Sequence, residues 1–132
     1  MNHPLFEQRQ QHSETRVVKA IFPGTTNHHD TLFGGQALAW MDEVAFISAT
    51  RFCRKPLVTV SSDRIDFKEP IPAGTFAELV ARVVGVGRTS LTVRVDIYLE
   101  SMYSDGQHLA ISGEFKFVAI GTDKKPVPVF DQ

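Results

Sequence analysis

One segment constrains the fold more than any other: residues 36–54, which read QALAWMDEVAFISATRFCR and contain neither glycine nor proline. Most of its residues favour helix, and at about 100° per residue its apolar side chains gather on one face. Those side chains belong to Leu38, Met41, Ala45, Ala49 and Phe52. The pattern predicts one long amphipathic helix that ends before Pro56 and packs against the rest of the chain.

The remaining sequence reads as strands. One is expected at 15–22, before the helix, and four more at 57–67, 75–86, 88–100 and 109–120, separated by segments that hold proline, glycine or Asp-Gly. Residues 75–86 are apolar on both alternating sets, which predicts a central strand buried on both faces. Together these elements predict an α+β fold, an antiparallel sheet around a single helix.

Length and charge exclude several classes of protein. A chain of 132 residues fits one domain, and its first 13 residues, polar and rich in Gln and His, are expected to be a disordered or frayed arm before a domain at 14–132. The net charge of -1 argues against nucleic-acid binding. No apolar run reaches the roughly 20 residues of a membrane helix, and no secretory signal is visible. With Cys53 as the single cysteine, a cytoplasmic location is expected.

Asp42 is the first candidate for chemistry. It lies within about 40° of the centre of the apolar helix face. Burial of a carboxylate there is costly unless the group is hydrogen-bonded or has a function. A carboxylate in such a place is a candidate general base. The alternative is a partly exposed aspartate that reaches past the edge of the helix.

Phe33, Gly34 and Gly35 come immediately before the helix. Glycines allow a ligand to approach the backbone closely, and the first N–H groups of a helix have no intrahelical acceptor. A carbonyl oxygen placed there would be polarised, as in an oxyanion hole. The alternative is a tight joint between loop and helix.

Two loops carry further candidates. Asn27 can orient a water or a carbonyl, although asparagine more often caps a turn. The segment Gly87, Arg88, Thr89 and Ser90 can grip a phosphate, although a plain β-turn is the commoner case. The neighbouring residues 28–30, His-His-Asp, suggest a metal, but adjacent side chains rarely converge on one ion. No metal site is therefore expected, and Cys53 has no histidine placed to activate it.

Four segments in this order resemble the hotdog-fold acyl-CoA thioester hydrolases: NHHDTLFGGQALAWMDEVA, VTVSSDRIDFKEPIPAGT, VGVGRTSLTVRVDIY and FVAI. The resemblance covers roughly residues 16–129. It implies a long central helix wrapped by a curved antiparallel sheet. It also implies a homodimer with a continuous sheet and shared active sites, assembled further to a tetramer or hexamer. Trp40 and Ile47 are apolar residues on the otherwise polar face of the helix. Their position indicates that this face is covered too, as it would be in a dimer. The ten phenylalanines would then line an acyl tunnel between two copies.

The resemblance also implies roles for particular residues. Asp42 would be the catalytic carboxylate, Asn27 its partner from the other subunit, and the N–H of Gly35 the group that polarises the thioester carbonyl. Phe33 and Gly34 would bind substrate beside it. The coenzyme A moiety would be bound by Lys68, Gly87, Arg88, Thr89 and Ser90. One departure is Asp30, where family members often carry glycine.

The expected reaction is hydrolysis of an acyl-CoA to free coenzyme A and a carboxylic acid, with no metal or redox cofactor. Asp42 would activate a water, or attack the carbonyl itself to form a mixed anhydride. Two alternatives stay open. One is an acyl-CoA sensor that binds without hydrolysis, and the other is a hotdog dehydratase acting on acyl thioesters, although those usually use a histidine and the predicted helix has none.

Overall fold

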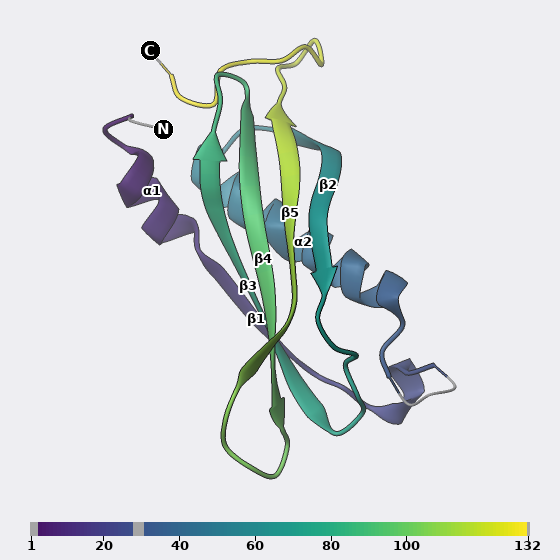
Figure 1. Ribbon diagram of the computed structural model, residues 1–132. Helices are drawn as coiled ribbons and strands as arrows, with labels where there is room; N and C mark the ends of the chain where they lie inside the picture. The colour runs from purple at the N-terminus through teal and green to yellow at the C-terminus, as the bar shows by residue number, and fades with distance from the viewer. Residues whose placement is uncertain (1–2, 28–30, 132) are drawn as a thin grey trace.

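A computed structural model describes residues 3–27 and 31–131, drawn in Figure 1. It contains the long helix and the five strands that the sequence predicts, with bounds that differ by a few residues. In chain order the elements are α1 (Phe6–Ser13), β1 (Thr15–Ala20), the 3-10 turn η1 (Pro23–Thr25), α2 (Gly34–Cys53), β2 (Leu57–Phe67), β3 (Thr75–Val86), β4 (Ser90–Ser101) and β5 (His108–Ala119).

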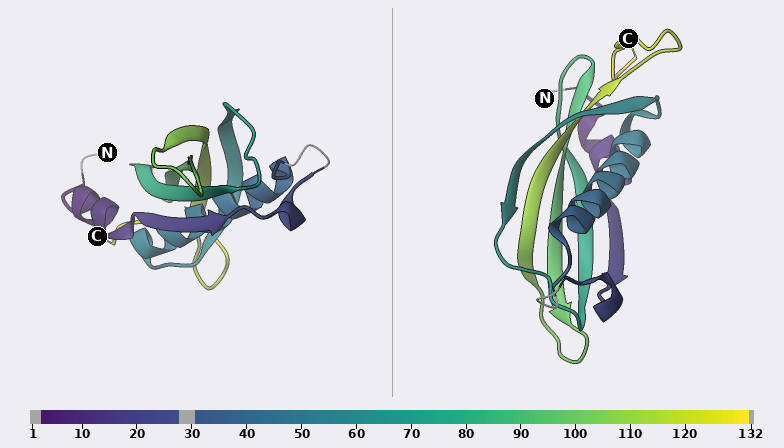
Figure 2. Two further views of the ribbon diagram at one scale, coloured as in Figure 1. Left: turned by 90° about the horizontal axis from the view of Figure 1, so that it is seen from below. Right: turned by 90° about the vertical axis from the view of Figure 1, so that its right-hand side faces the viewer.

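The five strands form one antiparallel sheet in the order β1-β3-β4-β5-β2. The sheet curves, and α2 lies across its concave side (Figures 1 and 2). The predicted antiparallel sheet around a single long helix is therefore confirmed. β2 follows α2 directly in the chain but pairs with the last strand, β5, so that β1 and β2 form the two edges.

The core lies between α2 and the inner face of the sheet. Met41 and Ala45 on the helix are fully buried, as the apolar stripe predicts. The inner side chains of β4 alternate with half-buried or exposed ones, and they belong to Leu91, Val93, Val95, Ile97 and Leu99. Gly113 of β5 leaves room for side chains of both β2 and the helix: a Cβ placed on it would lie 2.2 Å from Cδ1 of Ile65 and 3.3 Å from Cε of Met41.

Two expectations about burial are only partly met. β3 buries one face only: its inner residues are buried, but the outer residue Val84 is 41% exposed. On the second side of α2, Trp40 is half-buried beneath Lys19, whose Nζ lies 5.3 Å from the ring centroid. Ile47 on the same side stays exposed. Within the described residues of one chain, the outer side of β3 and part of α2 thus have no cover.

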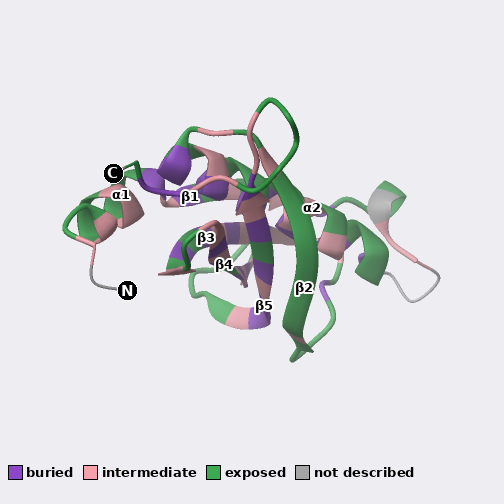
Figure 3. Ribbon diagram, turned by 90° about the horizontal axis from the view of Figure 1, so that it is seen from above, coloured by how far each residue is buried: buried purple, intermediate pink, exposed green. Residues whose placement is uncertain are grey.

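β2 is the most exposed strand of the sheet (Figure 3). Val58, Val60 and Phe67 are among its exposed side chains. Its register with β5 shifts between Thr59 and Ser61 and again between Asp63 and Asp66. Because β2 is an edge strand, one row of its backbone N–H and C=O groups faces away from the sheet, which is a template for pairing with another strand.

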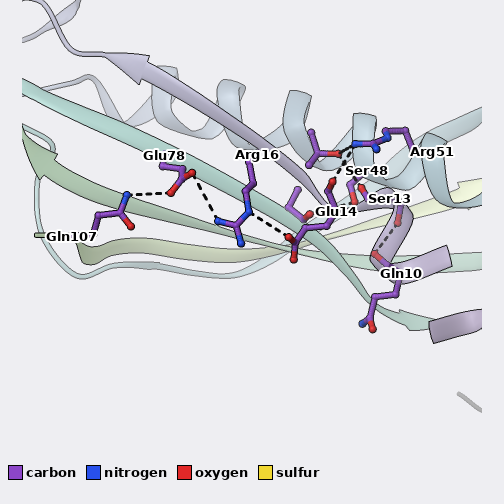
Figure 4. A network of polar contacts seen from close by, with 10 residues as sticks. Gln10, Ser13, Glu14, Arg16, Ser48, Arg51, Glu78 and Gln107 are labelled. Carbon is purple, nitrogen blue, oxygen red and sulfur yellow. Dashed lines mark hydrogen bonds and ion pairs between the residues drawn. The ribbon is translucent and has the colours of Figure 1, made fainter. Parts of the chain in front are cut away.

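The expected frayed arm is wrong for residues 6–13, which form α1 and pack against the core. The Phe6 ring meets Phe52 of α2 edge-on at 5.7 Å, and Phe130 of the C-terminal tail meets Phe52 at the same distance. Polar contacts add to this packing: the guanidinium of Arg51 donates to the Glu14 carbonyl at 3.1 Å (Figure 4) and to the His12 carbonyl at 2.7 Å. The partners that hold α1 come from distant parts of the chain.

Candidate active site

Asp42 lies on the third turn of α2, on the side that faces β2. Its Oδ1 atom lies 3.5 Å from the hydroxyl of Thr59, at the outer limit of a hydrogen bond. The two side chains line a hollow of about 470 Å³ between helix and edge strand. Other residues around it include Gly35, Leu38, Ser61, Ser62 and Phe115. Asp42 is half-buried, at the border of the apolar stripe rather than inside the core.

Thr59 is the residue that the sequence alone did not single out. Its hydroxyl reaches Asp42 because β2 passes beside α2, a neighbourhood set by the pairing of β2 with β5. The available signal is the run of hydroxyl side chains in VTVSS, directly after the predicted helix. Glu43, the neighbouring carboxylate, is exposed, as its position on the polar helix face predicts.

The start of α2 offers unpaired N–H groups. Phe33 is the N-cap residue, and no side chain caps the helix. The N–H groups of Gln36 and Ala37 already donate to the Phe33 carbonyl, at 3.0 and 3.1 Å. The N–H groups of Gly34 and Gly35 belong to the first helical residues, which have no intrahelical acceptor, and among the described residues no backbone carbonyl accepts from them. Gly35 lines the Asp42 hollow, and a Cβ placed on it would meet no atom within 4 Å.

Asn27 closes its own loop. Its Oδ1 accepts hydrogen bonds from the backbone N–H of Thr31 at 3.2 Å and from the Thr31 hydroxyl at 3.1 Å. Its backbone N–H donates to the Thr31 carbonyl. Asn27 is not among the described residues that line the Asp42 hollow. Residues 28–30, including the histidine pair and Asp30, lie outside the described residues.

Lys68 lies at a second cavity, on the other side of the helix start. Its Nζ pairs with Oδ2 of Asp66 at 2.8 Å. The cavity has a volume of about 360 Å³, and Gly34 and Lys68 are among its lining residues. Nearby, His108 forms an ion pair with Glu69 if its ring is protonated. Lys68 and Gly34 therefore share one cavity, and Asp42 and Gly35 share the other.

Residues 87–90 form the turn between β3 and β4, far from the helix start. Gly87 donates to the Ser90 carbonyl at 2.8 Å, and a Cβ on Gly87 would lie 2.9 Å from Ser90 Oγ. The carbonyls of Arg88 and Thr89 accept from the tail and from the end of β5. The Arg88 side chain is exposed. Figure 1 shows this turn at one end of the sheet and the start of α2 at the other, so one chain does not bring them together.

Other chemistry has little support in the described part of the chain. Across residues 3–27 and 31–131, no three His, Cys, Asp or Glu side chains are grouped to hold a metal ion. Cys53 is buried, and burial raises the pKa of its thiol, the opposite of what a nucleophilic cysteine needs. Neither helix among these residues has the length and apolar content that a membrane crossing requires.

Residues 29–104 match the family model described as the thioesterase superfamily. The chain belongs to this superfamily. The match spans the helix start, Asp42, Thr59 and the β3–β4 turn, and it confirms the resemblance on which the expected hotdog fold rests. The sheet order and the single long helix agree with that fold.

Similar proteins give the family more detail. The Bacillus subtilis protein YkhA, described as an uncharacterized acyl-CoA thioester hydrolase, is 41% identical over 118 residues, which cover 88% of this chain and 69% of YkhA. An acyl-CoA hydrolase from Staphylococcus aureus, solved with butyryl coenzyme A and coenzyme A, is 34% identical with a TM-score of 0.86, covering 90% of this chain and 73% of that one. Further structures of the S. aureus enzyme carry alanine in place of a threonine, an aspartate or an asparagine.

A third thioesterase of the superfamily, described as an apo-hexameric acyl-CoA thioesterase, is 33% identical with a TM-score of 0.86. The similarity covers 90% of this chain and 76% of that one. All three proteins are thus similar to this chain over almost its whole length.

Proposed function

We propose that this protein hydrolyses acyl-CoA thioesters to coenzyme A and a carboxylic acid, in active sites shared by two copies of the chain. The observation that carries the proposal is that Asp42 and Thr59 line one hollow on α2, while the start of the same helix, at Gly35, is uncapped and can serve a second copy. Hydrolysis of a thioester needs a general base to activate water, and hydrogen-bond donors, such as those of a helix N-terminus, to bind the carbonyl oxygen. The names of the relatives support the substrate class.

Geometry supports a division of the site between two copies. Gly35 and Asp42 of one chain are about 10 Å apart along the helix axis, since each residue rises 1.5 Å. Pairing of two β2 edges about a twofold axis reverses one copy relative to the other. The two α2 helices then run in opposite directions, with the start of one beside the middle of the other. Asp42 and Thr59 of one copy would face Gly34, Gly35 and Asn27 of its partner.

The opposite orientation of the two copies also brings together two groups of residues that could bind coenzyme A. The β3–β4 turn of one copy would lie at the same end of the joined sheet as the helix start of the other. Arg88, with the hydroxyls of Thr89 and Ser90, is placed there to meet the phosphates of coenzyme A. Lys68, already paired with Asp66, would need to exchange that partner for a phosphate. The hexameric relative supports assembly of such dimers into a tetramer or hexamer.

The chemistry follows from this arrangement. The thioester carbonyl oxygen accepts hydrogen bonds from the N–H groups at the start of α2, which lowers the energy of the oxyanion. Asp42 takes a proton from a water while the water oxygen attacks the carbonyl carbon. The carbon–sulfur bond then breaks, and the coenzyme A thiolate leaves and takes up a proton. In the rival route the Asp42 carboxylate attacks first, and water hydrolyses the mixed anhydride.

The central test compares Asp42→Ala with Glu43→Ala, a matched loss of the neighbouring carboxylate. Free thiol release from acyl-CoA should fall by about 10²- to 10⁴-fold in Asp42→Ala, since a general base contributes that much. Glu43→Ala should keep the wild-type rate, because its side chain is exposed on the opposite face. The buried Cys53 thiol, with its raised pKa, should react slowly with the thiol reagent and leave the signal to coenzyme A.

Measurements of ligand binding and of the products separate the proposal from its alternatives. Wild-type protein that binds acyl-CoA without thiol release would be a sensor. Formation of an unsaturated product from a hydroxyacyl thioester would identify a dehydratase. An Asp42→Ala rate equal to that of wild type would refute the role of Asp42 even if hydrolysis occurs.

A further inference from the structure

The C-terminal tail, residues 120–131, lies against the turn between β3 and β4, at the same end of the molecule (Figure 1). The backbone N–H of Val129 donates to the carbonyl of Arg88 at 2.9 Å. The N–H of Ala119, at the end of β5, donates to the carbonyl of Thr89, also at 2.9 Å. Both carbonyls of the turn are thus held, one by the tail and one by the strand that leads into it.

The planarity of the peptide bond determines what the turn offers on its other side. The C=O and N–H groups of a trans peptide point in opposite directions, and no peptide bond among the described residues is cis. Because the Arg88 carbonyl points to the tail, the N–H of Thr89 points away from the tail. Among the described residues no backbone carbonyl accepts from this N–H, and the Arg88 side chain is exposed. A backbone N–H and a guanidinium are donors that suit the oxygens of a phosphate.

Lys55, in the connection between α2 and β2, anchors the tail. Its Nζ donates to the carbonyl of Pro128 at 2.5 Å and to Oδ1 of Asp131 at 2.7 Å. The two residues between these contacts, Val129 and Phe130, are 1% and 6% exposed. The residue that bonds to the turn therefore lies between two contacts of a single ammonium group.

Lys55 acts on the turn through the tail rather than by direct contact. In the described part of the chain, no hydrogen bond or ion pair joins its side chain to residues 87–90. A loop that is ordered before its ligand arrives binds that ligand more tightly, because the cost of ordering no longer opposes binding. If the tail released the turn, the phosphate itself would have to order Arg88. The anchored tail therefore prepares the turn for an anion.

We propose that Lys55 is a positioning residue for coenzyme A, which holds the Arg88–Thr89 turn, through the tail, in the conformation that binds the phosphates of the substrate. This inference rests on the proposed hydrolysis of acyl-CoA and on the role of Arg88 in it. Lys55 touches neither the substrate nor the reacting atoms. Its effect is on selectivity, the preference for an acyl group carried by coenzyme A over the same group on a carrier without phosphates.

The test uses two substrates, the acyl-CoA that wild type hydrolyses fastest and the same acyl group on pantetheine. Both carry the thioester, but the second lacks the nucleotide and every phosphate. The carrier ratio is kcat/KM for the first divided by kcat/KM for the second. Lys55→Met keeps the apolar stem and removes the donors, and it should lower the carrier ratio by about threefold to tenfold. The loss should lie in KM for acyl-CoA, with kcat unchanged.

Two further variants make the test specific. Lys55→Arg supplies a cation with donors again and should return the carrier ratio towards the wild-type value. Lys125→Met removes the same charge from the same tail, but Lys125 is exposed and its side chain forms no ion pair with the described residues. It should keep the wild-type ratio. Because each variant is judged by a ratio of two substrates, loss of folded protein cancels. An unchanged ratio in Lys55→Met, or an equal loss in Lys125→Met, would overturn the proposal.

A double-mutant cycle tests whether Lys55 acts through the turn. Arg88→Ala alone should lower the carrier ratio by about tenfold or more, since hydrogen bonds to a charged group are lost. Lys55→Met should lower the ratio much less in the Arg88→Ala background than in wild type, because the group that the tail positions is gone. If the two effects simply multiply, Lys55 does not act through Arg88 and the proposal is wrong.

A binding measurement separates this inference from the proposed function. Calorimetry with free coenzyme A requires no hydrolysis, so the same variants report on the tail even if wild type releases no thiol and the proposed function fails. A Kd that rises in Lys55→Met but not in Lys125→Met supports the role of Lys55, and equal Kd values refute it. Absence of coenzyme A binding would refute both ideas. Hydrolysis with an unchanged carrier ratio in Lys55→Met would leave the proposed function standing and remove only the role of the tail.

Discussion

At the scale of single residues, two glycines illustrate different constraints. Gly87 is favoured by its own chain, because a methyl group there would lie 2.9 Å from the Ser90 hydroxyl, which would have to rotate away. Gly35 is not, because a methyl group at that helical position would meet open space. Within the proposed mechanism, the atom that needs the space at Gly35 is the substrate carbonyl. The same residue type therefore serves stability in one place and catalysis in the other.

The paired substitutions Gly35→Ala and Gly87→Ala test this difference. Gly35→Ala should raise the free energy of unfolding by about 0.5 kcal/mol, as alanine for glycine does in a helix. It should also lower kcat/KM by on the order of 10²-fold through misplacement of the carbonyl. Gly87→Ala should lower the free energy of unfolding by less than about 1 kcal/mol, because rotation of the Ser90 side chain relieves the contact. Denaturant unfolding and thiol release measure both, and a fully active Gly35→Ala enzyme would refute the role of the helix start.

The positions of Asp42 and of the glycines at the helix start could be predicted from the sequence. The helical periodicity gives the face on which Asp42 lies, and the local sequence gives the start of the helix. The location of Thr59 was not, because it depends on pairing between strands separated by about half of the chain. For Asn27 the sequence left two roles open, a turn and a catalytic partner. The hydrogen bonds to Thr31 supply the first, and the second remains a prediction about the assembled protein.

At the scale of elements, the spacing of apolar residues and the positions of turn residues predict the long helix and the strands. They do not predict α1. A helix of eight residues is marginal by itself, so its sequence carries little signal. Its stability comes from a cluster formed with the C-terminal tail, in which His3 stacks on Phe130 at 3.7 Å and Arg9 lies over the same ring. The periodicity of apolar residues along the sequence cannot predict a contact between the two ends of a chain.

The cluster predicts a large effect for Phe130→Ala. Phe130 is 6% exposed, and loss of a buried phenylalanine costs about 3 kcal/mol or more. The free energy of unfolding should fall by that amount in urea, with looser packing of α1 visible as faster amide exchange. Tyr103→Ala is the matched control, since Tyr103 is 91% exposed and should change stability by less than about 0.5 kcal/mol. Equal effects of the two substitutions would contradict the cluster.

At the scale of the whole molecule, the proposed active site needs a second copy of the chain. The uncovered apolar side chains of β2 and α2, together with the free edge of β2, are the surfaces that a second copy would cover. Within one chain, the β3–β4 turn and the start of α2 lie towards different ends of the sheet (Figure 1). Activity and assembly are therefore expected to be lost together.

Mixing two inactive variants tests the shared site directly. In a heterodimer of Asp42→Ala and Asn27→Ala, one site carries both substitutions and the other carries neither if the two residues come from different copies. Random mixing by unfolding and refolding should then restore about a quarter of wild-type activity. Thiol release measures the recovery, and each variant refolded alone is the control. No recovery, in a mixture shown to exchange subunits, would place both residues of each site in one copy.

The sheet order also governs how the protein is made. β2 is synthesised directly after α2, but the strand that it pairs with is β5, which leaves the ribosome last among the five. Until residues 108–119 emerge, a nascent chain can join β1, β3 and β4 but has no neighbour for β2. The wall of the hollow that carries Thr59 is thus completed at the end of synthesis, and interrupted translation would yield chains with a partial core and no site.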